Sequence, residues 1–247
     1  VALVVALAPL SCIAASRRRR GALHKMGDDA LDCDARIKLS IGTKKSGRDD
    51  GHSVFNVPMG LAFDHHRGLL LVADAENHRV QVFSCDDGAP LVSKFGEKGN
   101  QPGQLQYPWG LAIDHHHDRI LIGELGNHRV QSWSLSEQSF LSCIGQRGSG
   151  DLELNNPRGI AIDKHHHRIV IADTYNNRLV FLSSIDLSFL FSVGGKRGKR
   201  PGEFNCPSSI AIDDDRHRII VSDSYNFRVQ VLSSIDGSFL FEFGEEG

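Results

Sequence analysis

Residues 58–83 read PMGLAFDHHRGLLLVADAENHRVQVF, and the same pattern returns three more times along the chain. The other copies are PWGLAIDHHHDRILIGELGNHRVQSW from Pro108, PRGIAIDKHHHRIVIADTYNNRLVFL from Pro157 and PSSIAIDDDRHRIIVSDSYNFRVQVL from Pro207. They start 50, 49 and 50 residues apart. The chain is therefore built from one repeated structural unit, whose length constrains the fold.

Each copy predicts four short β-strands. Its apolar runs are brief, they are separated by turn residues, and they lack the spacing of an amphipathic helix. The fourth run ends on a glycine in every copy, namely Gly96, Gly145, Gly194 and Gly244. Four antiparallel strands in about 50 residues are typical of a β-propeller blade. We therefore predict an all-β fold with complete blades at 55–99, 105–148, 154–197 and 204–247.

Side-chain size predicts where each strand lies within its blade. We expect the first run to be innermost, because it carries a small residue in every copy, at Ala62, Ala112, Ala161 and Ala211. We expect large residues of the fourth run to fill the wider space between blades, and these are Phe189, Phe191, Phe239 and Phe241.

The region before the first copy has a different character. Residues 35–42, ARIKLSIG, match the fourth run and predict one strand of a preceding blade, so we expect a larger ring. Residues 1–34 are expected to lie outside the propeller. Residues 1–16 are apolar, residues 17–20 are arginines, and no initiator Met comes first. The open alternatives are an unfolded leader and a truncated membrane span whose arginines face the cytoplasm.

Charge and cysteine content limit the function classes. Residues 55–247 hold 18 Lys and Arg against 24 Asp and Glu, a net charge of −6. This acidic balance argues against DNA binding and against strong non-specific binding of nucleic acid. The five cysteines are odd in number and contain no CxxC pair, so we expect no disulfide framework and a reducing, cytoplasmic compartment.

The stretch DAENHRVQVF (74–83) and its counterpart ELGNHRVQ (124–131) resemble the NHL repeat, together with the preceding Pro-x-Gly-hydrophobic-Ala-hydrophobic-Asp pattern. The resemblance covers about residues 35–247, although Asn177 and Phe227 replace His in the last two copies. It implies a ring of about six blades. It also implies recruitment of protein or RNA, as in tripartite-motif ubiquitin ligases, or, in another branch, a metal-dependent lyase.

An acidic residue, an asparagine and an arginine recur at fixed spacing in all four copies. The sets are Asp74, Asn77 and Arg79; Glu124, Asn127 and Arg129; Asp173, Asn176 and Arg178; and Asp223, Asn226 and Arg228. We interpret them as structural, because a catalytic residue is expected once and not in every blade. Asparagine suits a left-handed turn, and the carboxylate can pair with the arginine.

The connection between the third and fourth copies carries the densest positive charge. Its cations are Lys196, Arg197, Lys199 and Arg200, and we expect Arg158 to lie beside them. Aromatic residues for stacking would be Tyr107, Trp109, Tyr175 and Tyr225. These residues are the candidates for binding a protein partner or single-stranded RNA. The alternative is a solvated loop.

Histidine is concentrated in the turn after the first strand. Nine of the 13 histidines lie there, and the candidates for a metal site are His66, His116 and His166. Repeat duplication also explains their recurrence, so we predict no metal and no cofactor.

The sequence therefore predicts a recognition or scaffold module without catalytic activity, which binds a protein partner. Single-stranded RNA binding and substrate recruitment for a ubiquitin ligase are the alternatives, followed by a metal-dependent lyase or hydrolase. No unique catalytic set stands outside the repeat register.

Overall fold

A computed structural model of the chain describes residues 3–4, 40–41, 54–85 and 91–245. It divides into two units, residues 1–54 and 55–247. In the first unit, β1 (Leu3–Val4) pairs antiparallel with β2 (Ser40–Ile41). Only these two short strands represent the predicted leader and the predicted strand at 35–42, and the rest of both segments lies outside the described residues.

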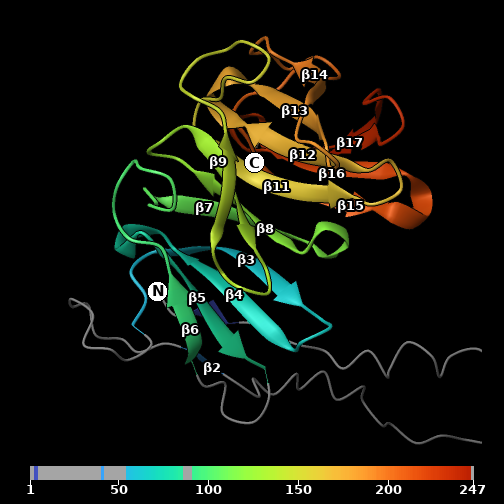
Figure 1. Cartoon of the computed structure of the whole chain (residues 1–247). Coiled ribbons are helices and arrows are strands. Elements are labelled where there is room, and N and C mark those ends of the chain that lie inside the picture. The colour runs from blue at the N-terminus through green and yellow to red at the C-terminus, as the bar shows by residue number, and fades with distance from the viewer. Residues whose placement is uncertain (1–2, 5–39, 42–53, 86–90, 246–247) are drawn as a thin grey trace, which may run out of the picture. The chain divides into compact units, whose positions relative to one another are not determined.

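The second unit consists of four antiparallel sheets of four strands, arranged as the blades of a propeller (Figure 1). The first blade contains β3 (Pro58–Asp64), β4 (Leu69–Asp74), β5 (Arg79–Ser84) and β6 (Leu91–Phe95). The second contains β7 (Pro108–Asp114), β8 (Arg119–Glu124), β9 (Arg129–Ser134) and β10 (Phe140–Ile144). The third contains β11 (Pro157–Asp163), β12 (Arg168–Asp173), β13 (Arg178–Ser183) and β14 (Phe189–Gly194). The fourth contains β15 (Pro207–Asp213), β16 (Arg218–Asp223), β17 (Arg228–Ser233) and β18 (Phe239–Phe243).

Helix is limited to single 3-10 turns between strands. They are η2 (Ala75–Asn77), η3 (His115–His117), η4 (Thr174–Asn176), η5 (Asp214–Arg216) and η6 (Ser224–Asn226). Within the described residues, no helix has the length and apolar character needed to span a bilayer. The predicted all-β class and the four blades are confirmed.

The first strands of the blades lie innermost and pack on one another in chain order, β3 on β7, β7 on β11 and β11 on β15 (Figure 1). Their closest approach occurs at glycine and not at the predicted alanines. A Cβ on Gly110 would lie 1.9 Å from the carbonyl oxygen of Arg158, and one on Gly60 would lie 2.0 Å from that of Trp109. In the fourth blade, the equivalent position is the exposed Ser209. Glycine is therefore needed where the next blade packs.

The hydrophobic core lies between the blades. Three clusters of buried side chains fill the three junctions between consecutive blades. Each junction is closed by an apolar residue from the connection that precedes the later blade, and these residues are Leu105, Leu154 and Phe204, with 0%, 2% and 0% of their surface exposed. Phe204 packs against Gly194, where a Cβ would meet its ring at 2.8 Å. The glycine that ends the fourth strand therefore leaves room for the residue that closes the junction.

Three of the four predicted space-filling phenylalanines contribute to these junctions, namely Phe189, Phe191 and Phe239. The ring of Phe191 stacks on Phe181, with centroids 4.2 Å apart. Phe241 is 43% exposed, because it lies on the last blade, where no described blade follows. For Phe241 the prediction stays untested, because the structure describes no blade on the outer side of this strand.

We expect Gly110→Ala to lower the free energy of unfolding by about 2 kcal/mol or more, because a rigid backbone carbonyl occupies the space of the new methyl group. Ser209→Ala is the matched control and should change stability by less than about 0.5 kcal/mol. Urea unfolding followed by circular dichroism measures both values. Equal effects of the two substitutions would contradict the proposed constraint at the axis.

Candidate functional site

The loops of the blades separate into two faces. The turns between second and third strands lie with the long connections between blades, since Asn127 Nδ2 donates to the carbonyl oxygen of Gly99 at 2.9 Å. We call this side the connection face. The turns between first and second strands, such as residues 65–68, and those between third and fourth strands form the opposite side, which we call the hairpin face.

A buried carboxylate organises each turn of the connection face. In the first blade, Asp74 accepts hydrogen bonds from Asn77 Nδ2 at 2.9 Å, Arg79 Nε at 2.8 Å and the backbone N–H of Asn56 at 2.7 Å. The same three donors surround Glu124, Asp173 and Asp223 in the other blades. All four carboxylates are 0% exposed. The predicted sets are thus brought together in every blade.

In the second, third and fourth blades, the arginine of the set also holds the connection that enters its blade. In the second blade, the Arg129 guanidinium donates to the carbonyl oxygens of Asn100, Gln101 and Gln104 at 2.8 to 3.1 Å. Arg178 and Arg228 make the equivalent contacts in the next two blades. Burial raises the pKa of the Asp173 carboxyl, and the hydrogen bonds from Asn155, Asn176 and Arg178 oppose that effect.

The residue after the motif asparagine holds the following connection. His78 Nδ1 accepts the backbone N–H of Tyr107 at 3.1 Å, and His128 Nδ1 accepts that of Asn156 at 3.2 Å. In the third blade, Asn177 Oδ1 accepts the N–H of Cys206 at 3.0 Å. An imidazole nitrogen and an amide oxygen therefore accept equivalent backbone hydrogen bonds. We call this contact, made by His78, His128 and Asn177, the junction clamp.

The residue after the motif asparagine has a left-handed backbone conformation. The prediction from the sequence placed this conformation at the asparagine itself. The φ angles are 56° at His78, 52° at His128, 54° at Asn177 and 56° at Phe227. Phe227 offers no acceptor atom and is 54% exposed. The replacement of His by Asn thus preserves the junction clamp, whereas the replacement by Phe removes it.

The aromatic candidates divide into two groups. The Arg158 guanidinium lies over the Trp109 ring at 4.9 Å from its centroid and near the Tyr175 ring at 5.9 Å. Tyr175 and Tyr225 are 50% and 61% exposed on neighbouring blades. Tyr107 instead packs its ring on His78, with centroids 4.7 Å apart, and so belongs to the junction.

A shallow depression at the axis adjoins Arg158 and Trp109. Its volume is about 220 Å³, and its wall includes Gly110, Gly159 and Ser208. The Nε atom of Arg158 is buried without a hydrogen-bond partner among the described residues. Ser208 Oγ lies 2.6 Å from Ser224 Oγ, which extends the polar rim toward the fourth blade. The serine pair was not predicted from the sequence, because its two residues lie 16 positions apart.

The four cations of the third connection, Lys196, Arg197, Lys199 and Arg200, are exposed. Arg228 fixes the backbone beneath them through the carbonyl oxygens of Lys199 and Arg200, at 2.7 and 3.2 Å. Arg158 does not join this group as expected. It lies on an inner strand and pairs with the aromatic rings, because its neighbour in space is the preceding inner strand.

The hairpin face carries the histidine-rich turns. The structure does not bring His66, His116 and His166 together as a set. His66 lies with His65 and His115, whereas His166 Nδ1 is 2.8 Å from Asp163 Oδ2 and is engaged within its own turn. The difference arises because His66 and His116 follow their aspartates by two residues and His166 follows by three.

Acid should weaken the junction clamps. Burial lowers the pKa of His78 and of His128 below their usual 6.5, so the folded chain holds fewer protons there than the unfolded chain. The stability that they contribute is full above about pH 6.5 and falls as the pH drops below it. We expect His78→Asn/His128→Asn to flatten the decline of unfolding free energy between about pH 7 and 5, because the amide oxygen accepts the same N–H without titrating.

Urea unfolding at a series of pH values measures this slope. The matched control, His116→Asn/His165→Asn, removes two exposed histidines from the hairpin face and should leave the slope near that of the parent chain. A parent-like slope in the His78→Asn/His128→Asn chain would disprove the role of the junction clamps.

Comparison with known proteins agrees with this geometry. Residues 55–83 and 204–232, in the first and fourth blades, match the NHL repeat. No match was found among curated proteins. Among solved structures, the chain is similar to hydrazine synthase of Kuenenia stuttgartiensis, with a TM-score of 0.58 and 11% identity over 80% of this chain and 53% of that one.

The chain is also similar to U3-55K, with a TM-score of 0.59 and 13% identity over 77% of this chain and 52% of that one. The chain thus spans about half the length of both structures, and at these identities the likeness concerns the fold alone. The NHL-repeat matches in the first and fourth blades, together with four blades of one design, support an NHL-repeat β-propeller.

Proposed function

We propose that the chain is a non-catalytic recognition module that binds a protein partner through the connection face. The observation that carries this proposal is the grouping of Arg158, Trp109 and Tyr175, with Tyr225 exposed on the next blade. Tryptophan, tyrosine and arginine are the residues that most often dominate the binding energy of protein interfaces.

The rigidity of this face supports the proposal. The carboxylate sets and junction clamps fix the loop backbones before any partner arrives, so few groups need to become ordered on binding. Tyr175 lies directly beside the motif residue Asn176 in the turn η4. The exposed rings are therefore presented by loops whose backbones are already hydrogen-bonded.

The depression of about 220 Å³ at the axis supplies the concave part of the surface. A side chain or chain end with a carbonyl or carboxylate oxygen suits it, because the buried Arg158 Nε has a hydrogen to donate. Recruitment of a substrate to a ubiquitin ligase is one role such a module can serve. Cys143 and Cys206 are free thiols, which supports a reducing, cytoplasmic location.

Selection of a random peptide library on the purified chain tests protein recognition. We expect enriched peptides to bind at least about tenfold more weakly to Tyr175→Ala/Tyr225→Ala, because two exposed rings are lost from the contact surface. The matched control is Ile185→Ala/Ile235→Ala, which removes side chains 71% and 60% exposed at turns of the hairpin face. Failure to enrich any peptide, or equal binding to both variants, would count against the proposal.

Single-stranded RNA is the second candidate, and the exposed segment 196–200 favours it. Cations held on a fixed backbone can neutralise phosphates while Tyr175 and Tyr225 stack on bases. The net charge of −6 over residues 55–247 opposes this candidate.

Fluorescence anisotropy with a mixed-sequence RNA at several salt concentrations measures RNA binding. If RNA binds, Lys196→Glu/Arg197→Glu should reduce the slope of log affinity against log salt by about 1.4, or about 0.7 for each lost phosphate contact. Lys164→Glu/Arg216→Glu on the hairpin face is the control with the same change of charge. No binding at modest salt would eliminate RNA as a ligand of this face.

A further inference from the structure

The turns between first and second strands, which lie on the hairpin face, follow one rule in all four blades. Each begins after the aspartate that ends the first strand, and the third residue beyond that aspartate bonds back to it. In the first blade, this residue is Arg67, whose Nη1 donates to Asp64 Oδ2 at 3.1 Å. The two residues between them, His65 and His66, are thereby left exposed.

The residue types at these free positions differ between blades. The first residue after the aspartate is His65, His115, Lys164 and Asp214 in the four blades, and the second is His66, His116, His165 and Asp215. Of the three junctions between described blades, only the first combines two histidines with a histidine at the first position of the next blade. At the second junction, the first position after the aspartate of the next blade is Lys164 and not a histidine.

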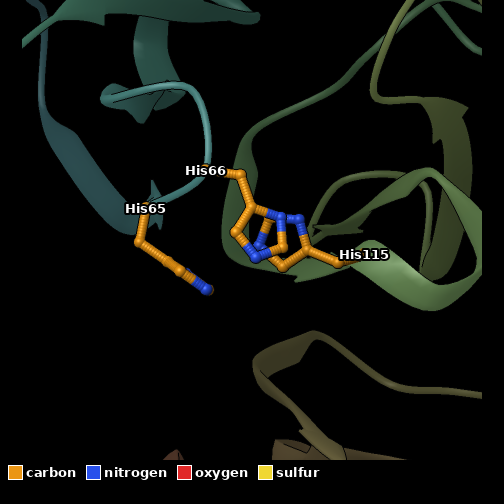
Figure 2. A group of neighbouring side chains, drawn as sticks. All are labelled: His65, His66 and His115. Carbon is orange, nitrogen blue, oxygen red and sulfur yellow. The ribbon is translucent and has the colours of Figure 1, made fainter.

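The three histidines of the first junction converge. Figure 2 shows His65 and His66 on the turn of the first blade and His115 on the facing turn of the second, with the His66 and His115 rings overlapping in this view and the His65 ring beside them. The ring centroids of His65 and His66 lie 4.9 and 4.3 Å from that of His115. One ring nitrogen from each residue lies within 4.8 Å of the other two.

These distances suit a metal ion after a small movement. Zinc binds imidazole nitrogen at about 2.0–2.1 Å, which places tetrahedral ligand atoms about 3.4 Å apart. The rings would need to close by about 1.4 Å, and the exposed His65 and His66 are free to change rotamer. In the first blade, Arg67 and not a histidine bonds back to Asp64, so this bond leaves the rings of His65 and His66 unused.

Charged side chains lie beside the three rings. Asp64 Oδ1 lies 4.0 Å from His115 Nδ1, on the side where a carboxylate orients a metal-binding imidazole in many sites. The positive charges of Lys164 and Arg67, by contrast, disfavour a cation.

We propose that His65, His66 and His115 form a binding site for one divalent transition-metal ion, with zinc as the fitting occupant. The three imidazoles would leave a coordination position open toward a cavity of about 390 Å³, whose wall also includes His116, Lys164 and Ser184. Because its ligands come from two blades, the ion would link the first blade to the second. The site lies on the hairpin face and is independent of partner binding on the connection face.

Titration of the untagged, chelator-treated chain with cobalt tests the site. Cobalt in a tetrahedral site with histidine ligands gives visible d–d absorption, and zinc added afterwards should displace it. We expect one equivalent to bind, and we expect His66→Ala and His115→Ala to weaken binding by at least about tenfold. Isothermal calorimetry with zinc supplies the affinities, and circular dichroism checks that each variant is folded.

The matched controls are His165→Ala and His217→Ala. These histidines lie at the third junction, where their ring centroids are 5.4 Å apart. The third ring there, that of His166, lies 5.8 Å from the His217 ring, and its Nδ1 is engaged by Asp163 at 2.8 Å. Both variants should bind as the parent chain does. Absence of stoichiometric binding would overturn the proposal. An equal loss of affinity in the control variants would also overturn it, because the metal would then be bound by scattered surface histidines or cysteines.

Discussion

The structure depends on one interaction repeated four times, the buried carboxylate that binds an arginine, an asparagine and a backbone N–H. An uncompensated carboxylate in such a place would be costly, but each of these accepts at least three hydrogen bonds. In the second blade, the arginine also donates hydrogen bonds to three carbonyl oxygens of the connection. One charge pair thus determines the path of about ten residues that have no regular secondary structure of their own.

Apolar packing holds the blades together, whereas polar interactions determine the conformations of the loops. The apolar clusters hold blade on blade, and the glycines at the axis set how closely the inner strands approach. Neither feature specifies the conformation of a loop. The carboxylate sets do so on one face, and aspartates such as Asp64 do so for the turns of the other. Differences between blades can therefore accumulate in exposed positions without disturbing the frame, which is where Tyr175, Lys199 and His65 are found.

The sequence was sufficient to predict the blades, because strand, turn and closing glycine recur in register. It was also sufficient to group Asp74, Asn77 and Arg79, which lie within six residues of one another. It was not sufficient to assign His78, whose partner is a backbone N–H 29 residues later. Nor could it locate the tightest contact at Gly110, since that depends on how inner strands meet in space. The metal candidates failed as a set for a similar reason, because one residue of offset turned His166 toward its own aspartate.

The junction clamp has a consequence for how the blades separate. Two junctions are clamped by histidines, at His78 and His128, and the third by an amide, at Asn177. Blades that contact only their neighbours behave approximately as a linear chain of coupled units, in which the weakest link opens first. Acid weakens the two earlier links and spares the last. In a mildly acidic environment, the first and second junctions would therefore lose stability relative to the third.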